Sequence, residues 1–176
     1  ILNLYLHQLD RARIQHFNPL TTTVNGQYPG QLFDAVLANP PFAGRVQKES
    51  ILADIALETR DTELLFLKWF VDNLAHLADS GRAGVIVPNG VLFGSGKADR
   101  KVRELLLTTC DLQAVIALPS GVFKPYSGVG TAILVFQKVR EIESKPGDAA
   151  LPPATQSVWF YELTADGYSL DDKRTE

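Results

Sequence analysis

The fold that we predict for this chain rests on the stretch from Phe33 to Gly44, FDAVLANPPFAG. An apolar run, LFDAVLA, stops abruptly at Asn39-Pro40-Pro41-Phe42. Short continuous apolar runs are typical of strands that are covered on both faces, as in the parallel sheets of α/β proteins. Neither proline has a backbone N–H, so neither can continue the ladder. We therefore expect a buried strand followed by a stiff turn.

Strands and helices alternate along the rest of the chain. Apolar residues recur at helical spacing in some segments and form short continuous runs in others. This alternation predicts an α/β domain with a mostly parallel sheet, in which two late strands, too close together for a helix between them, pair antiparallel. The expected helices are the end of one in residues 1–10, then 62–81 and 97–110, with a possible one near 49–58; the expected strands are 12–20, 32–38, 83–88, 112–119, 130–138 and 158–163.

The composition fits one folded domain with a tail. The 176 residues are 45% hydrophobic and 21% charged, which is enough apolar surface for a sizeable core. We expect a catalytic domain in residues 1–142, a linker in 143–157, and a late strand with a polar tail in 158–176. The single cysteine, Cys110, excludes a disulfide framework within the chain, and a reducing, cytoplasmic setting is the simplest expectation.

Charge and hydropathy limit the partners that we expect. A net charge of −3 argues against a free-standing protein that holds nucleic acid by bulk charge, although a local basic face stays open. No apolar run reaches the roughly 18 residues of a membrane-spanning helix, so no membrane partner is expected. The chain contains no methionine, and we therefore expect it to be a piece of a longer protein.

Three turns of similar composition follow predicted strands. They are Asn39 to Phe42, Pro88 to Gly90 and Pro119 to Gly121. The carboxyl ends of parallel strands meet at one edge of a sheet, and α/β sheets bind their ligands there. We therefore expect a pocket lined by these turns.

The first of these turns offers what an exocyclic amine on a planar ring requires. Asn39 has a side-chain carbonyl acceptor, Pro40 has a backbone carbonyl outside any ladder, and Phe42 has a flat apolar face. Pro40 and Pro41 stiffen the turn, so the spacing of the acceptors is fixed. Two accepted hydrogen bonds draw an aryl amine towards tetrahedral geometry and free its lone pair, and they strengthen as positive charge develops on the nitrogen. A plain proline-rich turn with Asn39 as its cap is the structural alternative.

The stretch FDAVLANPPF resembles the catalytic motif of amino-group DNA methyltransferases that use S-adenosylmethionine. Three other stretches, LKWFVDNLAHLADSGRAGVIVPNGVLF, VRELLLTTCDLQAVIALPSGVF and VWFYELTADGYSLDDKR, look like the methylation subunit of type I restriction–modification systems, an adenine-N6 DNA methyltransferase. The resemblance implies a Rossmann-like methyltransferase sheet, mostly parallel with an antiparallel late strand and truncated at its N-terminus. It also implies S-adenosylmethionine as cofactor, and DNA with specificity and restriction subunits as partners.

The resemblance assigns a role to each matching residue. Asn39 and the Pro40 carbonyl would hold the adenine amino group and Phe42 would stack on the base, which must first be flipped out of the duplex. Phe123, in SGVF, falls where related enzymes place a second aromatic ring against the base, although a plain core residue would also fit. Asn18, in HFNPL, stands where the family shows an acidic residue near the cofactor, and an ordinary Asn-Pro turn is its alternative. The family's glycine-rich cofactor loop has no counterpart in the chain and would lie upstream of Ile1.

Two other functions remain open at this point. A methyltransferase of another amino group, on an RNA base or a protein glutamine, would use the same kind of turn. A non-catalytic assembly module would keep the fold and dock a specificity subunit. A basic cluster is either a solvated helix face or a contact for phosphate or a partner subunit; it consists of Arg82, Lys97, Arg100, Lys101 and Arg103.

Overall fold

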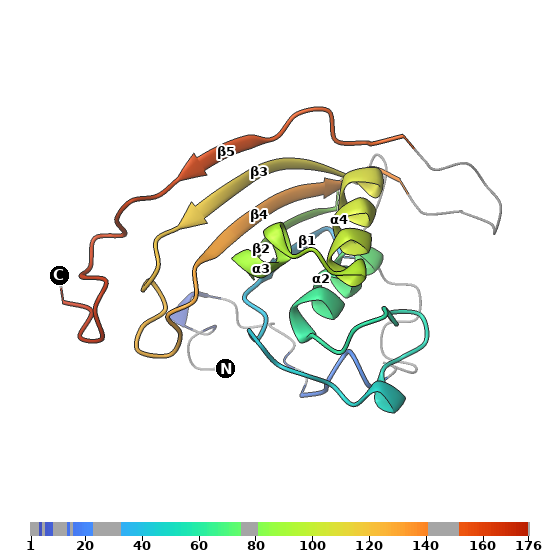
Figure 1. The fold of residues 1–176 in the computed structure, drawn as a ribbon, viewed down its shortest axis with the longest axis horizontal. Helices are drawn as coiled ribbons and strands as arrows, with labels where there is room; N and C mark the ends of the chain where they lie inside the picture. Colours follow the sequence, from blue (N-terminus) through green and yellow to red (C-terminus); the bar gives the residue numbers. More distant parts are fainter. Residues whose placement is uncertain are drawn as a thin grey trace.

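The structure, a computed structural model, describes residues 4, 6–8, 14, 16–22, 33–74, 81–140 and 152–175. Its strands form one five-stranded sheet in the order β1-β2-β4-β3-β5 (Figure 1). The strands are β1 (Ala35–Ala38), β2 (Arg82–Pro88), β3 (Cys110–Leu118), β4 (Thr131–Lys138) and β5 (Trp159–Glu162). The helices are α2 (Thr62–Asn73), α3 (Asn89–Phe93) and α4 (Lys97–Thr109), and η1 (Lys48–Ser50) is a short 3₁₀ helix.

Among the described strands, only β4 runs against its neighbours. β1 pairs parallel with β2, and β3 pairs parallel with β5, whereas β4 pairs antiparallel with both β2 and β3. The predicted α/β sheet, mostly parallel with an antiparallel late strand, is therefore confirmed. Because of these directions, the ends of β1, β2 and β3 and the start of β4 all lie at the same edge of the sheet.

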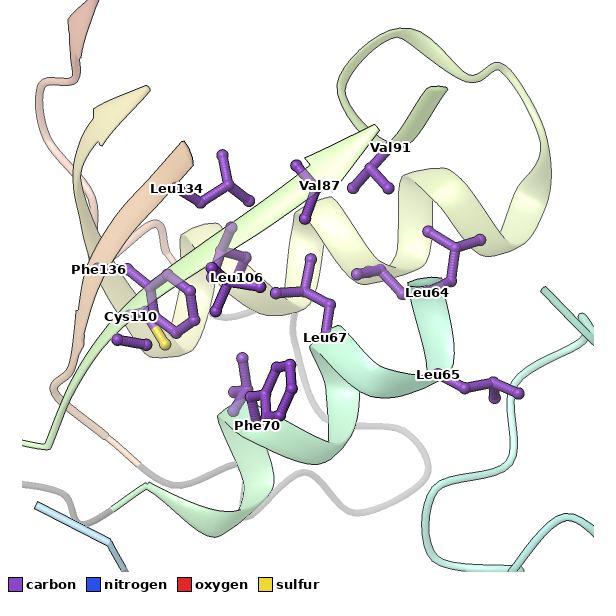
Figure 2. Packing of buried hydrophobic residues seen from close by; sticks show 14 of the residues in the cluster. Leu64, Leu65, Leu67, Phe70, Val87, Val91, Leu106, Cys110, Leu134 and Phe136 are labelled. Carbon is purple, nitrogen blue, oxygen red and sulfur yellow. The ribbon is translucent and has the colours of Figure 1, made fainter. Parts of the chain in front are cut away.

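Helices α2 and α4 pack side by side on one face of the sheet and enclose the core (Figure 1). Figure 2 shows the apolar layer between these helices and the sheet. In this layer, Leu67 and Phe70 of α2 and Leu106 of α4 pack with Leu134 and Phe136 of β4. The side chains of Leu134 and Phe136 are 1% and 0% exposed. Full burial of a side chain of this size contributes about 1.5–3 kcal/mol, so this layer supplies much of the stability of the fold.

The end of α2 differs from the prediction. The apolar spacing predicts a helix to residue 81, but α2 ends at Asn73, and Leu74 has extended backbone that bridges Phe33. The Asn73 side chain donates to the Trp69 carbonyl at 2.8 Å, and such a local bond competes with the helical pattern. Leu74 is nevertheless fully buried, and residues 75–80 of the predicted helix lie outside the described residues.

Two other predicted elements are not found among the described residues. Of the strand predicted for 12–20, residues 12, 13 and 15 lie outside the described residues. Residues 16–22 contain no strand, because the Asn18 carbonyl accepts the N–H groups of Thr21 and Thr22 and closes a turn. The α-helix expected near 49–58 is absent, and the only helical residues in this segment belong to η1 at its start. The side chains of Ile55 and Leu57 are both buried, although the backbone there is irregular. The two residues are two positions apart, whereas residues on one face of a helix are three or four positions apart.

Strand β1 is not covered on both faces, contrary to the expectation from its continuous apolar run. Its residues alternate between exposed and half-buried, and Leu37 is 90% exposed. The Leu37 side chain lies over Gly84 of the neighbouring strand, and a Cβ added to Gly84 would lie 3.1 Å from Leu37 Cδ2. Among the described residues, no helix packs on this face of β1, so only Val36 and Ala38 pack against the core.

Strand β5 extends the sheet beyond β3. Before it, the Thr155 hydroxyl donates to the Cys110 carbonyl at 2.8 Å and accepts the Leu112 N–H at 2.9 Å. The Ala154 N–H donates to the Leu107 carbonyl at 2.8 Å. The last residues of the predicted linker, 143–157, are therefore bound to α4 and β3.

None of the helices in the described ranges has the length and apolarity that a membrane crossing requires.

Candidate active site

The turn Asn39-Pro40-Pro41-Phe42 follows directly on β1, at the edge where β2 and β3 also end. Pro40 is buried, Phe42 is half-buried, and Asn39 and Pro41 are exposed. Within the described ranges, no hydrogen bond engages the Asn39 side chain. The turn therefore presents an accessible amide beside a partly exposed ring, with one proline as a buried anchor.

Two hydrogen bonds hold this turn against the start of α2. Thr62 Oγ1 donates to the Pro41 carbonyl at 3.3 Å, and the Thr62 N–H donates to the Gly44 carbonyl at 3.0 Å. A Cβ on Gly44 would lie 2.7 Å from Thr62 Oγ1, so this approach requires glycine. Ala43 has a φ of 55°, which bends the chain after Phe42. No local signal in the sequence marks Thr62, because its role depends on a turn that is remote along the chain.

Phe123 lies against Phe42. The ring centroids are 5.7 Å apart and the ring planes meet at 76°, an edge-to-face arrangement. Such pairs contribute about 0.5–1.5 kcal/mol beyond their burial. Phe123 is half-buried and belongs to the loop between β3 and β4, and the structure thus brings the two predicted aromatic site residues into contact.

The end of β2 and the start of β4 are joined at the same edge. The Asn89 N–H, at the start of α3, donates to the carbonyl of Gly130, just before β4, at 2.9 Å. A Cβ on Gly130 would lie 2.7 Å from Asn89 Nδ2. The loops after β2 and β3 therefore adjoin the edge that carries the Asn39 to Phe42 turn, as the parallel arrangement of the strands predicts.

Asn18 lies in a turn of its own. Its Oδ1 accepts the Leu20 N–H at 3.0 Å, and Leu20 is 1% exposed. The Leu20 carbonyl accepts the Leu52 N–H at 3.0 Å, which ties this turn to the loop after η1. The side-chain carbonyl of Asn18 thus positions a core leucine, and the assignment of Asn18 to the cofactor stays a prediction.

A second group of charges lies at the opposite end of the sheet. Lys138, at the end of β4, is 2% exposed, and its Nζ donates to the Asp72 carbonyl at 3.5 Å. Burial raises the pKa of the Asp72 carboxyl, while its hydrogen bond with Lys68 acts in the lowering direction. A cavity of about 410 Å³ lies beside these residues, and a second of about 490 Å³ is lined by Lys48 and residues 57–60. The Asn39 to Phe42 turn lines neither of these two cavities.

Metal-ligating side chains do not gather in the part of the chain that the structure describes. No group of three or more His, Cys, Asp or Glu residues there could hold a metal ion.

The basic cluster divides into two kinds of residue. Arg103 donates from Nη1 to the Val91 carbonyl and from Nη2 to the Gly94 carbonyl, both at 2.7 Å. Its guanidinium therefore satisfies carbonyls at the end of α3, where a cation is favoured. Lys97, Arg100 and Lys101 are exposed on α4.

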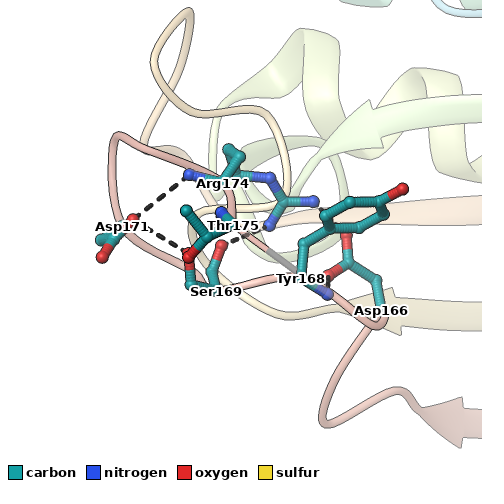
Figure 3. A network of polar contacts seen from close by, with 6 residues as sticks. All are labelled: Asp166, Tyr168, Ser169, Asp171, Arg174 and Thr175. Atoms are coloured by element: carbon teal, nitrogen blue, oxygen red, sulfur yellow. Dashed lines mark hydrogen bonds and ion pairs between the residues drawn. The ribbon is translucent and has the colours of Figure 1, made fainter.

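Residues 166–175, which we call the tail turn, form a network of polar contacts (Figure 3). Arg174 makes an ion pair with Asp166, donates to the Ser169 carbonyl at 3.0 Å, and lies over the Tyr168 ring, 5.4 Å from its centroid. Asp171 Oδ1 accepts the Lys173 N–H at 2.9 Å. The hydrogen bond from Arg174 lowers the pKa of Asp166, and the Lys173 N–H lowers that of Asp171. The sequence predicts only a polar tail here.

The chain is similar to methylase subunits of type I restriction enzymes. The type I restriction enzyme EcoEI methylase subunit of Escherichia coli is 36% identical over 163 residues, which cover 91% of this chain and 29% of that protein. The type I restriction enzyme StySPI methylase subunit of Salmonella potsdam is 33% identical over 146 residues, which cover 81% of this chain and 25% of that protein. The chain thus spans less than a third of the length of these relatives.

Solved structures show the same fold. A modification subunit of a putative type I restriction enzyme from Vibrio vulnificus YJ016 has a TM-score of 0.74 and 29% identity, covering 99% of this chain and 35% of that chain. A chain from a study of complex assembly in the type I restriction–modification system has a TM-score of 0.72 and 30% identity, covering 94% of this chain and 30% of that chain. The N-6 DNA Methylase family model matches residues 1–176. A match of this extent shows that the chain belongs to the N-6 DNA Methylase family.

Proposed function

We propose that this chain is the catalytic part of an adenine-N6 DNA methyltransferase of a type I restriction–modification system. The observation that carries the proposal is the Asn39-Pro40-Pro41-Phe42 turn, which stands at the ligand-binding edge of the sheet with Phe123 against its ring. The relatives support it, because they are named methylase subunits of type I restriction enzymes at 33% to 36% identity.

The chemistry of the turn follows from its two acceptors. Asn39 Oδ1 and the Pro40 carbonyl accept the two hydrogens of the adenine amino group, which localises the nitrogen lone pair. With a methyl donor bound, that lone pair would be free to accept the methyl group, and the nitrogen would then lose a proton to water. The two hydrogen bonds strengthen as charge develops, so they stabilise the transition state more than the bound adenine.

Phe42 and Phe123 receive the base. Extruding an adenine from a duplex costs a few kcal/mol, and stacking on an aromatic ring contributes about 1–3 kcal/mol in return. Phe42 is half-buried, so part of its surface is open to a ligand, and Phe123 bounds that surface through their edge-to-face contact.

S-adenosylmethionine supplies the methyl group in this proposal. The turns after β1, β2 and β3 contain no glycine-rich loop of the kind that receives its methionine part. Asn18 is the candidate contact, and its Oδ1 is already bonded to the Leu20 N–H, which leaves the amide N–H groups to meet an acceptor of the cofactor. The described residues therefore do not make a complete cofactor site, and we assign them no step that involves the cofactor itself.

We also propose the setting in which the chain works. Its partners are DNA and the specificity and restriction subunits of the same system, and its location is the cytoplasm. Residues 1–142 make up the catalytic domain, 143–157 the linker, and 158–176 the late strand with its tail. The relatives support the partners through their names alone, and the contacts of Ala154 and Thr155 show that the end of the linker is held close to α4 and β3.

Product analysis tests the proposal. The full-length protein, expressed with its proposed specificity subunit, is incubated with labelled S-adenosylmethionine and unmethylated DNA, RNA or protein. We expect N6-methyladenine in the DNA digest. Label in RNA or on glutamine would favour a methyltransferase of another amino group, and the absence of transfer to all three would favour a non-catalytic assembly module.

Replacing Phe42 with alanine is expected to weaken the binding of a flipped base about 5- to 100-fold, because the stacking face is lost. Phe42→Tyr and Phe42→Trp keep a flat π-face and should retain methylation. The measurement is the affinity for a duplex with a mismatched target adenine, which lowers the energy of extrusion. If Phe42→Ala bound this duplex as well as the parent does, Phe42 would not be the stacking residue.

The 176-residue chain by itself is expected to bind S-adenosylmethionine weakly and to transfer no methyl group, since the described residues form no complete cofactor site. Isothermal titration calorimetry measures this directly. A dissociation constant below about 10 μM, roughly −7 kcal/mol, would show that the chain contains a cofactor site other than the one assigned above.

A further inference from the structure

The tail turn contacts the loop that carries Phe123. Gly121 is buried and has a φ of 100°, a conformation that favours glycine. A Cβ on Gly121 would lie 2.5 Å from the Leu170 carbonyl oxygen, so the backbone of the tail turn rests directly on this glycine. Lys124 Nζ lies 3.4 Å from Asp172 Oδ1, which gives a second link between the two segments.

Hydrogen bonds within the loop connect Gly121 to Phe123. The Lys124 N–H donates to the Gly121 carbonyl at 3.0 Å, and the Ser127 N–H donates to the Phe123 carbonyl at 2.9 Å. These bonds make residues 121–127 a series of tight turns, so a displacement of Gly121 displaces Phe123. The Phe123 ring in turn contacts Phe42.

An ion pair and several hydrogen bonds close the tail turn on itself. Its ion pair between Asp166 and Arg174 leaves the two side chains only 18% exposed, and Ser169 and Thr175 are joined by three hydrogen bonds. Leu170 and Asp172, which contact the Phe123 loop, lie within the segment that these contacts close.

We propose that the tail turn is a positioning element for base binding: it holds the Phe123 loop at the distance from the Asn39 to Phe42 turn that a flipped adenine requires. This inference rests on the function proposed above and adds a role for residues that lie outside the Asn39 to Phe42 turn and the Phe123 loop. Small misplacements matter in such sites, since a shift of about 1 Å can cost about 100-fold in rate.

A matched pair of glycine variants tests the contact. Gly121→Ala places a methyl group against the Leu170 carbonyl, whereas Gly128→Ala, in the same loop, meets no atom within 4 Å. In the full-length protein, Gly121→Ala should lower kcat for methylation about 10- to 100-fold while the affinity for S-adenosylmethionine is unchanged. Gly128→Ala should match the parent in both.

A second pair of variants changes the tail turn itself. This pair tests the positioning role even if Gly121→Ala does not fold. Arg174→Ala removes the ion pair to Asp166, and Lys173→Ala, its exposed neighbour, is the control. Arg174→Ala should speed amide exchange in residues 119–130 about 10-fold or more, as expected when a supporting contact is lost. Its methylation defect should be smaller on a duplex with a mismatched target adenine, because extrusion then costs less.

The outcomes separate this inference from the proposed function. Methylation by the parent, with both kcat and the exchange of residues 119–130 in Arg174→Ala within twofold of the parent, would overturn the positioning role alone. Faster exchange with unchanged kcat would also overturn it, because the support would then not reach the reaction. A parent without methylation would overturn the proposed function, and the exchange data would still report whether the tail turn holds the loop.

Discussion

Replacing Asn39 with alanine is expected to lower the rate of methyl transfer about 100- to 1,000-fold, the usual effect of removing one preorganised hydrogen-bonding group at a reacting centre. Asn39 is exposed at the end of β1, and its side chain has no hydrogen-bond partner among the described residues. We therefore expect the substitution to leave the fold intact and to remove one of the two proposed acceptors for the adenine amino group. The remaining acceptor, the Pro40 carbonyl, is unchanged.

The assay uses tritiated S-adenosylmethionine and the full-length protein. Gln47→Ala is a matched control, because Gln47 is also an exposed amide in the segment before α2. Calorimetry should show that Asn39→Ala binds the cofactor as the parent does. Retention of more than about a tenth of the parent rate would contradict the role of Asn39, since one such group is worth about 3 kcal/mol.

Replacing Phe136 with alanine is expected to lower the free energy of unfolding by about 3–5 kcal/mol. Phe136 is 0% exposed in the middle strand β4, and its neighbours across the ladder are Ala83 on β2 and Leu112 on β3. Figure 2 shows its ring in the layer between the sheet and the helices, close to Leu106. Truncation leaves a cavity that small neighbours such as Ala83 cannot fill.

Urea unfolding followed by circular dichroism measures this loss. Val135→Ala is the control, because Val135 is adjacent and only half-buried on the opposite face of the sheet. We expect it to lower the free energy of unfolding by about 1 kcal/mol or less, roughly one or two buried methyl groups. If the two variants were equally stable, the core would not be centred on the helix-covered face.

Local rules in the sequence were enough to predict the strands that build the site. β2, β3 and β4 are apolar runs bounded by proline or glycine, and Pro88 ends β2 where the ladder must stop. The directions of the strands then follow from the lengths of the connections, including the antiparallel pairing of β3 with β4. The place of Asn39 at the sheet edge is a consequence of these two rules.

Contacts between remote segments could not be predicted in this way. Thr62 supports the Asn39 to Phe42 turn, and Leu170 supports the Phe123 loop, yet neither residue differs from many others of its type. The helix expected near 49–58 fails for a related reason: Ile55 and Leu57 reach the core from irregular backbone, so tertiary packing overrides local propensity. Such residues are found only once the packing partners are known.

The position of β4 between β2 and β3 affects the order in which the two parts of the candidate site, the Asn39 to Phe42 turn and the Phe123 loop, open during unfolding. A strand paired on both sides opens only when the sheet does, so the Phe123 loop, which runs directly into β4, is tethered to the slowest-opening part of the fold. Among the described strands, β1 is an outer one and has only four residues, so it detaches sooner and takes Asn39 with it. Phe123 is thus expected to stay in place after the whole Asn39 to Phe42 turn has detached, and we expect loss of activity on warming or in mild denaturant to precede loss of the fold.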